Sequence, residues 1–187
     1  MVLPAIAILT PLVLLILPTD GGAYVDGAPP GHTGGFEEPT CTSCHFGNPV
    51  NDSAGTLEIS APSAFVPGEE YPLEIRLRHP ELERAGFQLS ARFAKGSDSG
   101  DQAGVLSPGA GVEIVEEDGV QYARHTRDGV EPREGHEIEW RFRWKAPAAA
   151  EPPVVFHVAA NAGNYDDSEF GDFVYRRAVE AKPVPPE

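Results

Sequence analysis

The chain has few cysteines, methionines and basic residues, and each shortage excludes a class of protein. Two cysteines among 187 residues are too few for a disulfide-rich scaffold or a cysteine-rich zinc site. Only 14 Lys and Arg residues stand against 29 Asp and Glu, which gives a formal net charge of −15. Nucleic acid is therefore not an expected partner, because its phosphates repel such a surface. Gly-x-Ser-x-Gly, phosphate-loop and His-Glu-x-x-His motifs are also missing from the sequence, so no catalytic set emerges.

Both cysteines stand in the run Cys41-Thr42-Ser43-Cys44-His45. A Cys-x-x-Cys-His run is the attachment signature of c-type haem, in which two thiols bind the porphyrin vinyl groups and the imidazole becomes the proximal iron ligand. The two bonds meet one edge of a planar ring, so the cysteines must be separated by a tight turn, which Thr42 and Ser43 suit. We therefore expect one covalent haem c on Cys41 and Cys44, with His45 as the proximal ligand.

Other uses of a Cys-x-x-Cys pair stay open, namely a redox dithiol, a structural disulfide or part of a metal clip. Zinc would need a second pair of Cys or His ligands at short spacing, which the sequence does not offer. A thioredoxin-like motif lies between a strand and a helix, whereas this run follows a segment rich in Gly and Pro. Haem attachment is the interpretation that fits best.

The N-terminal residues 1–23 predict export. Residues 2–18 are almost wholly apolar and uncharged, and small residues suited to cleavage follow them. No Lys or Arg precedes the apolar run, and its 17 residues are at the lower limit for spanning a bilayer, so an uncleaved anchor is the alternative to a signal peptide. Either segment delivers the rest of the chain to the periplasm, the cell surface or the medium, and a membrane would be contacted only through an uncleaved segment.

The remainder divides into an irregular coil over residues 24–54, a β-patterned domain over 55–182 and a short tail over 183–187. The coil is rich in Gly, Pro, Thr, Asp and Asn and has no apolar periodicity. Beyond Gly55, apolar residues alternate with polar ones, as in half-buried strands. The alternating sets are Leu57 and Ile59; Leu73, Ile75 and Leu77; Phe87, Leu89, Ala91 and Phe93; Val112 and Ile114; Val120 and Tyr122; Ile138, Trp140, Phe142 and Trp144; Val154, Phe156, Val158 and Ala160; Phe173 and Tyr175.

Seven to nine short strands separated by turns predict an all-β fold, an antiparallel β-sandwich of immunoglobulin-like type. The segment 137–144 predicts a strand with one solvated face, because Glu and Arg alternate there with apolar residues. Its aromatic stripe of Trp140, Phe142 and Trp144 has strand spacing, and we expect it in the core rather than around a cofactor.

Several stretches resemble bacterial secreted proteins of the choice-of-anchor V type, whose β-sandwich is similar to the Reeler domain. The resemblance covers about Gly31 to Glu180. It rests on the run Gly34 to His45, on Ala85 to Leu89, on Tyr122 to Thr126, on Trp140 to Pro147 and on the segment 159–175. It implies a Reeler-like sandwich and a secreted location, but no known reaction.

The sixth iron ligand cannot be a methionine of the exported domain, because the only methionine is Met1. His79 and His136 stand at strand ends and are expected to be exposed, and His157 is expected on a surface opposite the apolar Phe156 set. His32 lies in the same coil as His45 and is an alternative distal ligand. His125 is preferred, since it follows the Val120 and Tyr122 strand, fits the family pattern and would tie the haem to the rigid sandwich. An open site is the remaining alternative.

One acidic loop is a candidate calcium site. Asp166, Asp167, Glu169 and Asp172 crowd together with Asn161 and Asn164, and oxygen-rich loops of this kind bind calcium in extracellular domains. The spacing matches no EF-hand, so a hydrated acidic loop is the simpler interpretation.

These observations favour a secreted or periplasmic monohaem electron carrier whose redox partner has a basic docking face. Two alternatives stay open: an extracellular binding or assembly module in which haem is structural or sensory, and an open-site haem enzyme or gas sensor.

Overall fold

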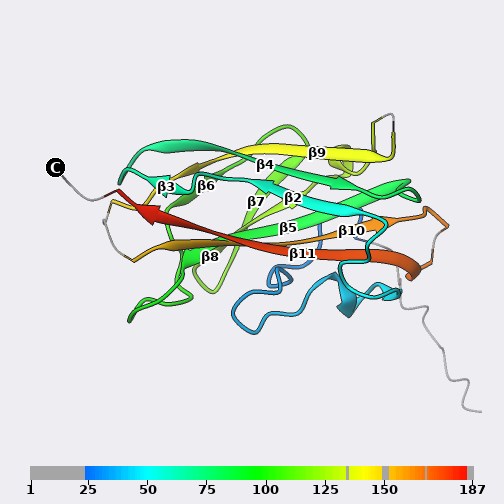
Figure 1. Ribbon diagram of the computed structural model, residues 1–187, viewed down its shortest axis with the longest axis horizontal. Helices are drawn as coiled ribbons and strands as arrows, with labels where there is room; N and C mark the ends of the chain where they lie inside the picture. Colours follow the sequence, from blue (N-terminus) through cyan, green and yellow to red (C-terminus); the bar gives the residue numbers. More distant parts are fainter. Residues whose placement is uncertain (1–23, 134, 149–151, 167, 185–187) are drawn as a thin grey trace, which may run out of the picture.

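A computed structural model of the 187-residue chain describes residues 24–133, 135–148, 152–166 and 168–184. Its strands form two layers packed face to face (Figure 1). The seven-stranded sheet runs in the order β1 (Phe46–Gly47), β11 (Phe170–Pro183), β10 (Val154–Gly163), β5 (Arg84–Phe93), β8 (Val120–His125) and β7 (Val112–Glu117), and β3 (Ala64–Phe65) also pairs with β11. The four-stranded sheet runs in the order β2 (Thr56–Ser60), β4 (Glu70–Arg78), β9 (Glu137–Lys145) and β6 (Val105–Ser107). Two short 3₁₀ helices, η1 (Cys41–Ser43) and η2 (Arg127–Gly129), complete the described elements.

The predicted β-sandwich is confirmed, and each of the eight alternating segments lies in a strand. Three short strands, β1, β3 and β6, were not predicted, because two or three residues carry no alternation. The pairing is also not wholly antiparallel, since β1 and β3 both run parallel to β11. Strand β11 continues through Pro183, one residue into the expected tail, and the predicted export segment 1–23 lies outside the described residues.

The expected aromatic stripe lies in the core. Trp140 and Trp144 are buried, and their rings pack 4.5 Å from Phe87 and 4.9 Å from Phe156 between ring centroids. The indole N–H of Trp144 donates to the Ala103 carbonyl oxygen at 2.8 Å, so its polar atom is satisfied without water. The prediction that this stripe is core rather than a cofactor wall is confirmed for the strand β9 side chains.

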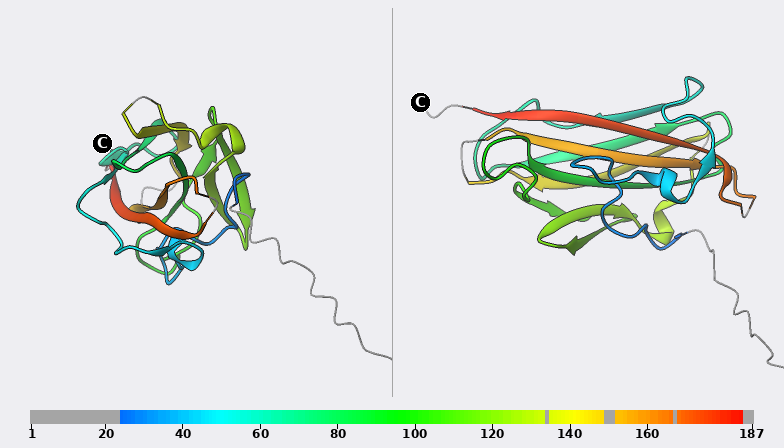
Figure 2. Two further views of the ribbon diagram at one scale, coloured as in Figure 1. Left: turned by 90° about the vertical axis from the view of Figure 1, so that its right-hand side faces the viewer. Right: turned by 90° about the horizontal axis from the view of Figure 1, so that it is seen from below.

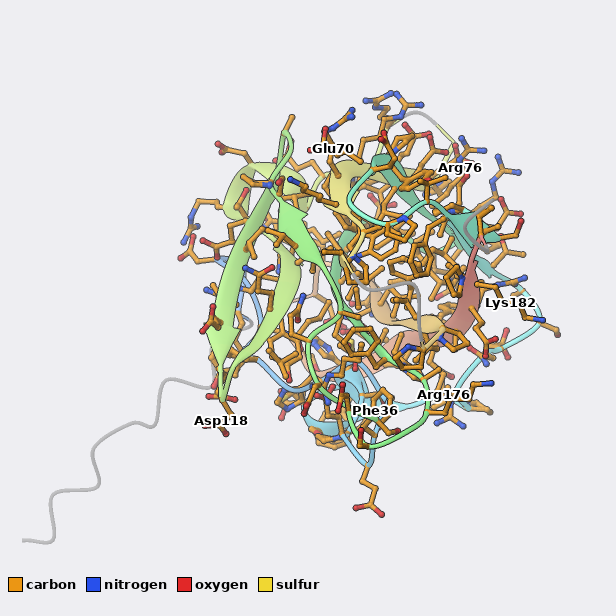
Figure 3. All side chains as sticks on the ribbon, turned by 90° about the vertical axis from the view of Figure 1, so that its left-hand side faces the viewer. Phe36, Glu70, Arg76, Asp118, Arg176 and Lys182 are labelled. Atoms are coloured by element: carbon orange, nitrogen blue, oxygen red, sulfur yellow. The ribbon has the colours of Figure 1, made fainter. Side chains whose placement is uncertain are left out.

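The opposite face of β9 is polar, as the sequence predicted, and it carries ion pairs with β4. Glu70 and Arg76 mark this face, which lies on the other side of the molecule from Phe36 (Figure 3). Arg76 donates to Glu139 at 2.7 Å, and Arg141 donates to Glu74 at 3.0 Å. The hydrogen bond from Arg76 lowers the pKa of Glu139. The arginines of these pairs are 39% and 65% exposed, so solvent screens the pairs and each is worth up to about 1 kcal/mol.

The coil of residues 24–54 packs along the outer face of the seven-stranded sheet (Figure 2, right). Because the coil covers this face, the expected orientation of β8, with Val120 and Tyr122 toward the core, is wrong. Register pairs Leu89 of β5 with Ala123, so Ala123 enters the core, while Tyr122 points outward and is buried beneath the coil. The sheet therefore has two covered faces, and a simple inside-outside alternation does not describe it.

Candidate functional site

The Cys41 to His45 run forms the tight turn that its spacing predicted. Helix η1 begins after Thr40, whose side-chain oxygen accepts a hydrogen bond from the Thr42 N–H. The N–H groups of Cys44 and His45 both donate to the Cys41 carbonyl oxygen, at 3.2 and 2.9 Å. The side chain of Cys41 is half-buried and that of Cys44 is exposed, and both are free thiols. The backbone thus closes locally and places an exposed Cys44 beside a more buried Cys41.

The His45 imidazole is held by an aspartate from the far end of the chain. Its Nδ1 atom lies 2.5 Å from Oδ2 of Asp172 on β11, and Asp172 is 5% exposed. Asn161 of β10 donates from Nδ2 to the same Oδ2 at 3.0 Å. Burial alone would raise the pKa of Asp172, but the hydrogen bonds from His45 and Asn161 outweigh it and lower that pKa. Asp172 is therefore a carboxylate, and Nδ1 of His45 carries the proton it accepts.

Asp172 was a candidate calcium ligand in the sequence, and the structure turns it toward His45 instead. Asp166 binds within its own loop, accepting from Asn164 Nδ2 at 3.1 Å and from the Ser168 N–H at 3.0 Å. Asp167 lies outside the described residues. Among the residues that are described, no group of three or more His, Cys, Asp or Glu is placed to hold a metal ion.

A cavity of about 510 Å³ opens between the coil and the outer face of the sheet. All five residues that the sequence singled out for a haem line it: Cys41, Cys44, His45, His32 and His125. The rest of the wall combines apolar residues, such as Val25, Ala28, Pro29, Phe46 and Val130, with the carboxylates of Asp166, Glu169 and Asp172. Arg84 lies at the same wall, where its guanidinium stacks 3.7 Å from the Tyr165 ring centroid. Such size and lining are typical of ligand sites.

His32 is fixed to the cavity wall through its Nδ1 side. That atom lies 3.1 Å from the Pro29 carbonyl oxygen and 3.0 Å from the Pro30 carbonyl oxygen. The backbone N–H of His32 donates at 2.7 Å to Oε1 of Gln88, whose Nε2 donates to the Pro29 carbonyl at 2.8 Å. Gln88 lies on β5 and is 1% exposed. One buried amide therefore holds the turn that presents His32.

His125 uses both ring nitrogens in backbone hydrogen bonds. Its Nδ1 accepts from the Phe87 N–H at 3.1 Å, and its Nε2 lies 3.0 Å from the Tyr24 carbonyl oxygen. The side chain is 7% exposed, and burial lowers its pKa. The ring fills the space beside Gly86, where a Cβ atom would lie 2.5 Å from Cε1 of His125. His125 thus secures the start of the coil to β5.

The sequence predicted that the other three histidines are exposed, which is wrong for two of them and right for the third. His79 is buried at 1% exposure and stacks on Phe173 at 3.8 Å, contrary to the expected exposure, because the strand end folds under β11. His157 is half-buried rather than on an open surface, because Gly35 and Phe36 of the coil cover it. His136 is exposed, as predicted.

A buried ion pair fastens the coil three residues before the motif. Arg92 of β5 and Glu38 of the coil pair with side chains that are 9% and 11% exposed, and the Tyr122 hydroxyl donates to Oε1 of Glu38 at 2.7 Å. The Oε2 atom accepts from the N–H and hydroxyl of Thr33. We call Glu38, Arg92, Tyr122 and Thr33 the coil clamp. It sets the position of the cysteine turn against the rigid sheet.

The pKa of the Cys41 thiol tests the alternative that the cysteine pair is a redox dithiol. Reactive dithiols depend on a lowered thiol pKa and a cationic neighbourhood. Burial instead raises the pKa of the Cys41 thiol to about 12. Cys41 therefore lacks the lowered thiol pKa on which a redox dithiol depends.

Sequence reasoning missed Gln88 as a site residue, and it placed Asp172 and Asn161 in a candidate calcium loop rather than beside His45. Each of the three is a buried polar side chain on a strand whose other face enters the core. For Gln88 the signal in the sequence was a polar residue at the outward position of an otherwise apolar strand, which ordinarily indicates solvent. Only the coil's position over that face makes these residues part of a site.

Across the described residues, no helix is long and apolar enough to cross a membrane.

The protein matches no family model and no curated protein. Solved structures that overlap with it include the Reeler domain of human F-spondin, at 14% identity and a TM-score of 0.46 over 69% of this chain and 88% of that one. A cohesin module from a family 33 glycoside hydrolase of Clostridium perfringens gives 13% identity and a TM-score of 0.45 over 70% and 98%. A non-cellulosomal cohesin from Archaeoglobus fulgidus gives 8% and 0.37 over 70% and 91%. The chain is thus similar to these domains in its β-sandwich fold, which hosts unrelated functions.

Proposed function

We propose that this protein is an exported monohaem electron carrier of c-type, with one haem c bound covalently to Cys41 and Cys44 and with His45 as the proximal ligand. The observation that carries the proposal is the convergence of both free thiols and a carboxylate-held imidazole on one cavity. Histidines that bind metals ordinarily donate their second ring N–H to a carboxylate or carbonyl, as His45 donates to Asp172.

The cavity wall fits the group. Its volume of about 510 Å³ is within the usual range of about 300–1,000 Å³ for ligand sites. Apolar side chains such as Val25, Phe46 and Val130 suit the faces of a porphyrin, and the thiols lie on the coil side of the same space. Arg84 is the cation at this wall that would pair with a propionate. A haem bound there would supply an iron that takes up and releases one electron.

Residues around the cavity would set the reduction potential of the iron and the structural change that accompanies electron transfer. The Asp172 carboxylate draws the Nδ1 proton of His45 and makes the imidazole a stronger donor to iron, which favours the oxidised state and a low potential. The coil clamp keeps the cysteine turn in place, so that little reorganisation accompanies gain or loss of the electron.

The partner we expect is a redox protein with a basic docking face, because the chain carries a formal net charge of −15. Large apolar side chains are exposed beside the motif, including Tyr24, Phe46, Tyr165 and Phe170, and the rings of Phe46 and Phe170 lie 5.6 Å apart. A small apolar contact on an acidic protein is suited to the brief encounters of electron transfer.

The test is expression of the full chain, with its export segment, in cells that carry a haem-attachment system. The expected product has the mass of one added haem, a pyridine haemochrome spectrum typical of two thioether bonds and a reversible one-electron titration. Replacing both Cys41 and Cys44 by Ser should abolish the covalent haem, whereas Ser99→Ala, a substitution of an exposed hydroxyl, should not. Protein that is soluble and folded yet free of covalent haem would refute the proposal and leave the binding-module alternative. Covalent haem that binds peroxide or carbon monoxide rapidly would favour the open-site alternative.

A further inference from the structure

We infer that His32, and not His125, is the second axial ligand of the iron, and that His125 is a structural residue. This inference rests on the proposed function, since it concerns the face of the haem opposite His45. Both histidines line the cavity, so position alone does not separate them. Their hydrogen bonds do.

The hydrogen bonds of His32 determine its tautomer. Carbonyl oxygens only accept, so Nδ1 of His32, which lies 3.0 Å from the Pro30 carbonyl oxygen, must carry the proton. The Nε2 atom then holds a lone pair, and within the described part of the chain it makes no hydrogen bond. His45 has the same arrangement, with Nδ1 donating to Asp172. Among the residues that the structure describes, neither imidazole makes a hydrogen bond through Nε2, and in both rings Nδ1 is held as in metal sites.

His125 has the opposite arrangement. Its Nε2 faces the Tyr24 carbonyl oxygen at 3.0 Å and must carry the proton, while its Nδ1 accepts from the Phe87 N–H at 3.1 Å. Coordination through Nδ1 would take the lone pair that the Phe87 N–H uses, and coordination through Nε2 would move the ring proton to Nδ1. Either way the buried Phe87 N–H would lose this acceptor, which is costly, whereas the Tyr24 carbonyl oxygen also accepts from the Gly27 N–H at 2.9 Å. Gly86 also packs against the ring, so the imidazole has little room to turn.

The segment that carries His32 is held in place before any ligand binds. Gln88 bonds to the His32 N–H at 2.7 Å and to the Pro29 carbonyl at 2.8 Å, and it is buried on the rigid strand β5. Each coil histidine thus has a strand residue behind it: Gln88 behind His32 and Asp172 behind His45. A ligand already fixed at the wall loses little conformational freedom when it coordinates.

The experiment compares His32→Gln with His125→Gln in protein carrying covalent haem. Glutamine has one acceptor and one donor, so it can replace both hydrogen bonds of His125, but it is a poor iron ligand. His136→Gln, at an exposed position, is the matched control. The readouts are the visible spectrum, the electron paramagnetic resonance signal and carbon monoxide binding, each read beside the haem content.

We expect low-spin iron in the parent protein, in His125→Gln and in His136→Gln. His32→Gln should be high-spin, should bind carbon monoxide at least tenfold faster, and should return to low spin when imidazole is added. A high-spin His125→Gln beside a low-spin His32→Gln would overturn the inference in favour of His125. A low-spin His32→Gln would overturn the inference while leaving the proposed function standing. A high-spin parent with covalent haem would overturn the inference and favour the open-site alternative, and a loss of covalent haem would remove both the inference and the proposed function. Gln88→Leu gives a second measure, because loss of the amide should produce a mixed-spin spectrum with His32 still present.

Discussion

Glu38→Gln should release the coil from the sheet while the β-sandwich stays folded. The substitution keeps the shape of the side chain but removes the charge that pairs with Arg92. Both partners are nearly buried, at 11% and 9% exposure, so the pair is in the regime of buried rather than surface ion pairs. Removing one partner of a buried pair costs about 3–5 kcal/mol, because the other charge is left without compensation.

The loss should appear in the opening of the coil rather than in global unfolding. A segment held by few apolar contacts opens locally, with its own free energy. A loss of about 3 kcal/mol corresponds to about 150-fold more opening, since each 1.4 kcal/mol is tenfold. Hydrogen exchange of the amides of residues 24–54, and limited proteolysis of the same segment, measure this directly. Fluorescence of the buried Trp140 and Trp144 reports whether the sandwich is intact.

Glu37→Gln is the matched control, because Glu37 is an exposed carboxylate in the same turn that forms no hydrogen bond or ion pair within the described ranges. The double variant Glu38→Leu with Arg92→Met should open less than Glu38→Gln, since both buried charges are then gone. If Glu38→Gln exchanged no faster than Glu37→Gln, the clamp would not be what holds the coil, and the reasoning would be refuted.

Three further predictions concern the buried histidine, the His45 support and the core. Burial lowers the pKa of His79 below the unfolded value of about 6.5, so the unfolded state takes up its proton first, and stability should decline as the pH falls through 6.5. His79→Asn keeps an acceptor for the Glu81 N–H and should flatten that decline in urea titrations between about pH 6.5 and 5, while an unchanged slope would assign it elsewhere. Asp172→Asn should raise the potential of the haem protein by about 60–130 mV, if a charged hydrogen bond contributes about 1.5–3 kcal/mol to the oxidised state, and spectroelectrochemistry would contradict this by finding no more change than in Asp166→Asn. Phe87→Ala should cost about 3–5 kcal/mol in urea unfolding, because it removes a ring buried against Trp140, whereas Phe170→Ala, at 60% exposure, should cost less than about 0.5 kcal/mol. An equal loss in these two variants would mean that the core is not where the structure places it.

The alternation of apolar and polar residues along the sequence was enough to predict the β-sandwich. The alternation of apolar and polar residues identified the long strands, because successive side chains of a strand point to opposite faces and only one of these faces was expected to be buried. It failed for β1 and β3, which are two residues long and pair in parallel with β11 through contacts distant in sequence. It also misplaced Tyr122 and His157, since alternation separates two faces of a strand but does not say that the second face is covered as well.

The sequence by itself determined that two thiols and an imidazole lie together in one local turn, because residues 41–45 are adjacent in the chain, and the turn is present. The sequence could name His32 and His125 as candidates for the second axial ligand. It could not choose between them, because the choice depends on which ring nitrogen of each histidine is free to coordinate. That was decided by tertiary contacts: Asp172 lies 127 residues from His45, Gln88 lies 56 from His32, and the Phe87 N–H is 38 from His125. The first two of these hydrogen bonds form only when the coil docks on the sheet, and the third forms only when β5 and β8 pair, so the tautomer of each ring depends on the tertiary fold.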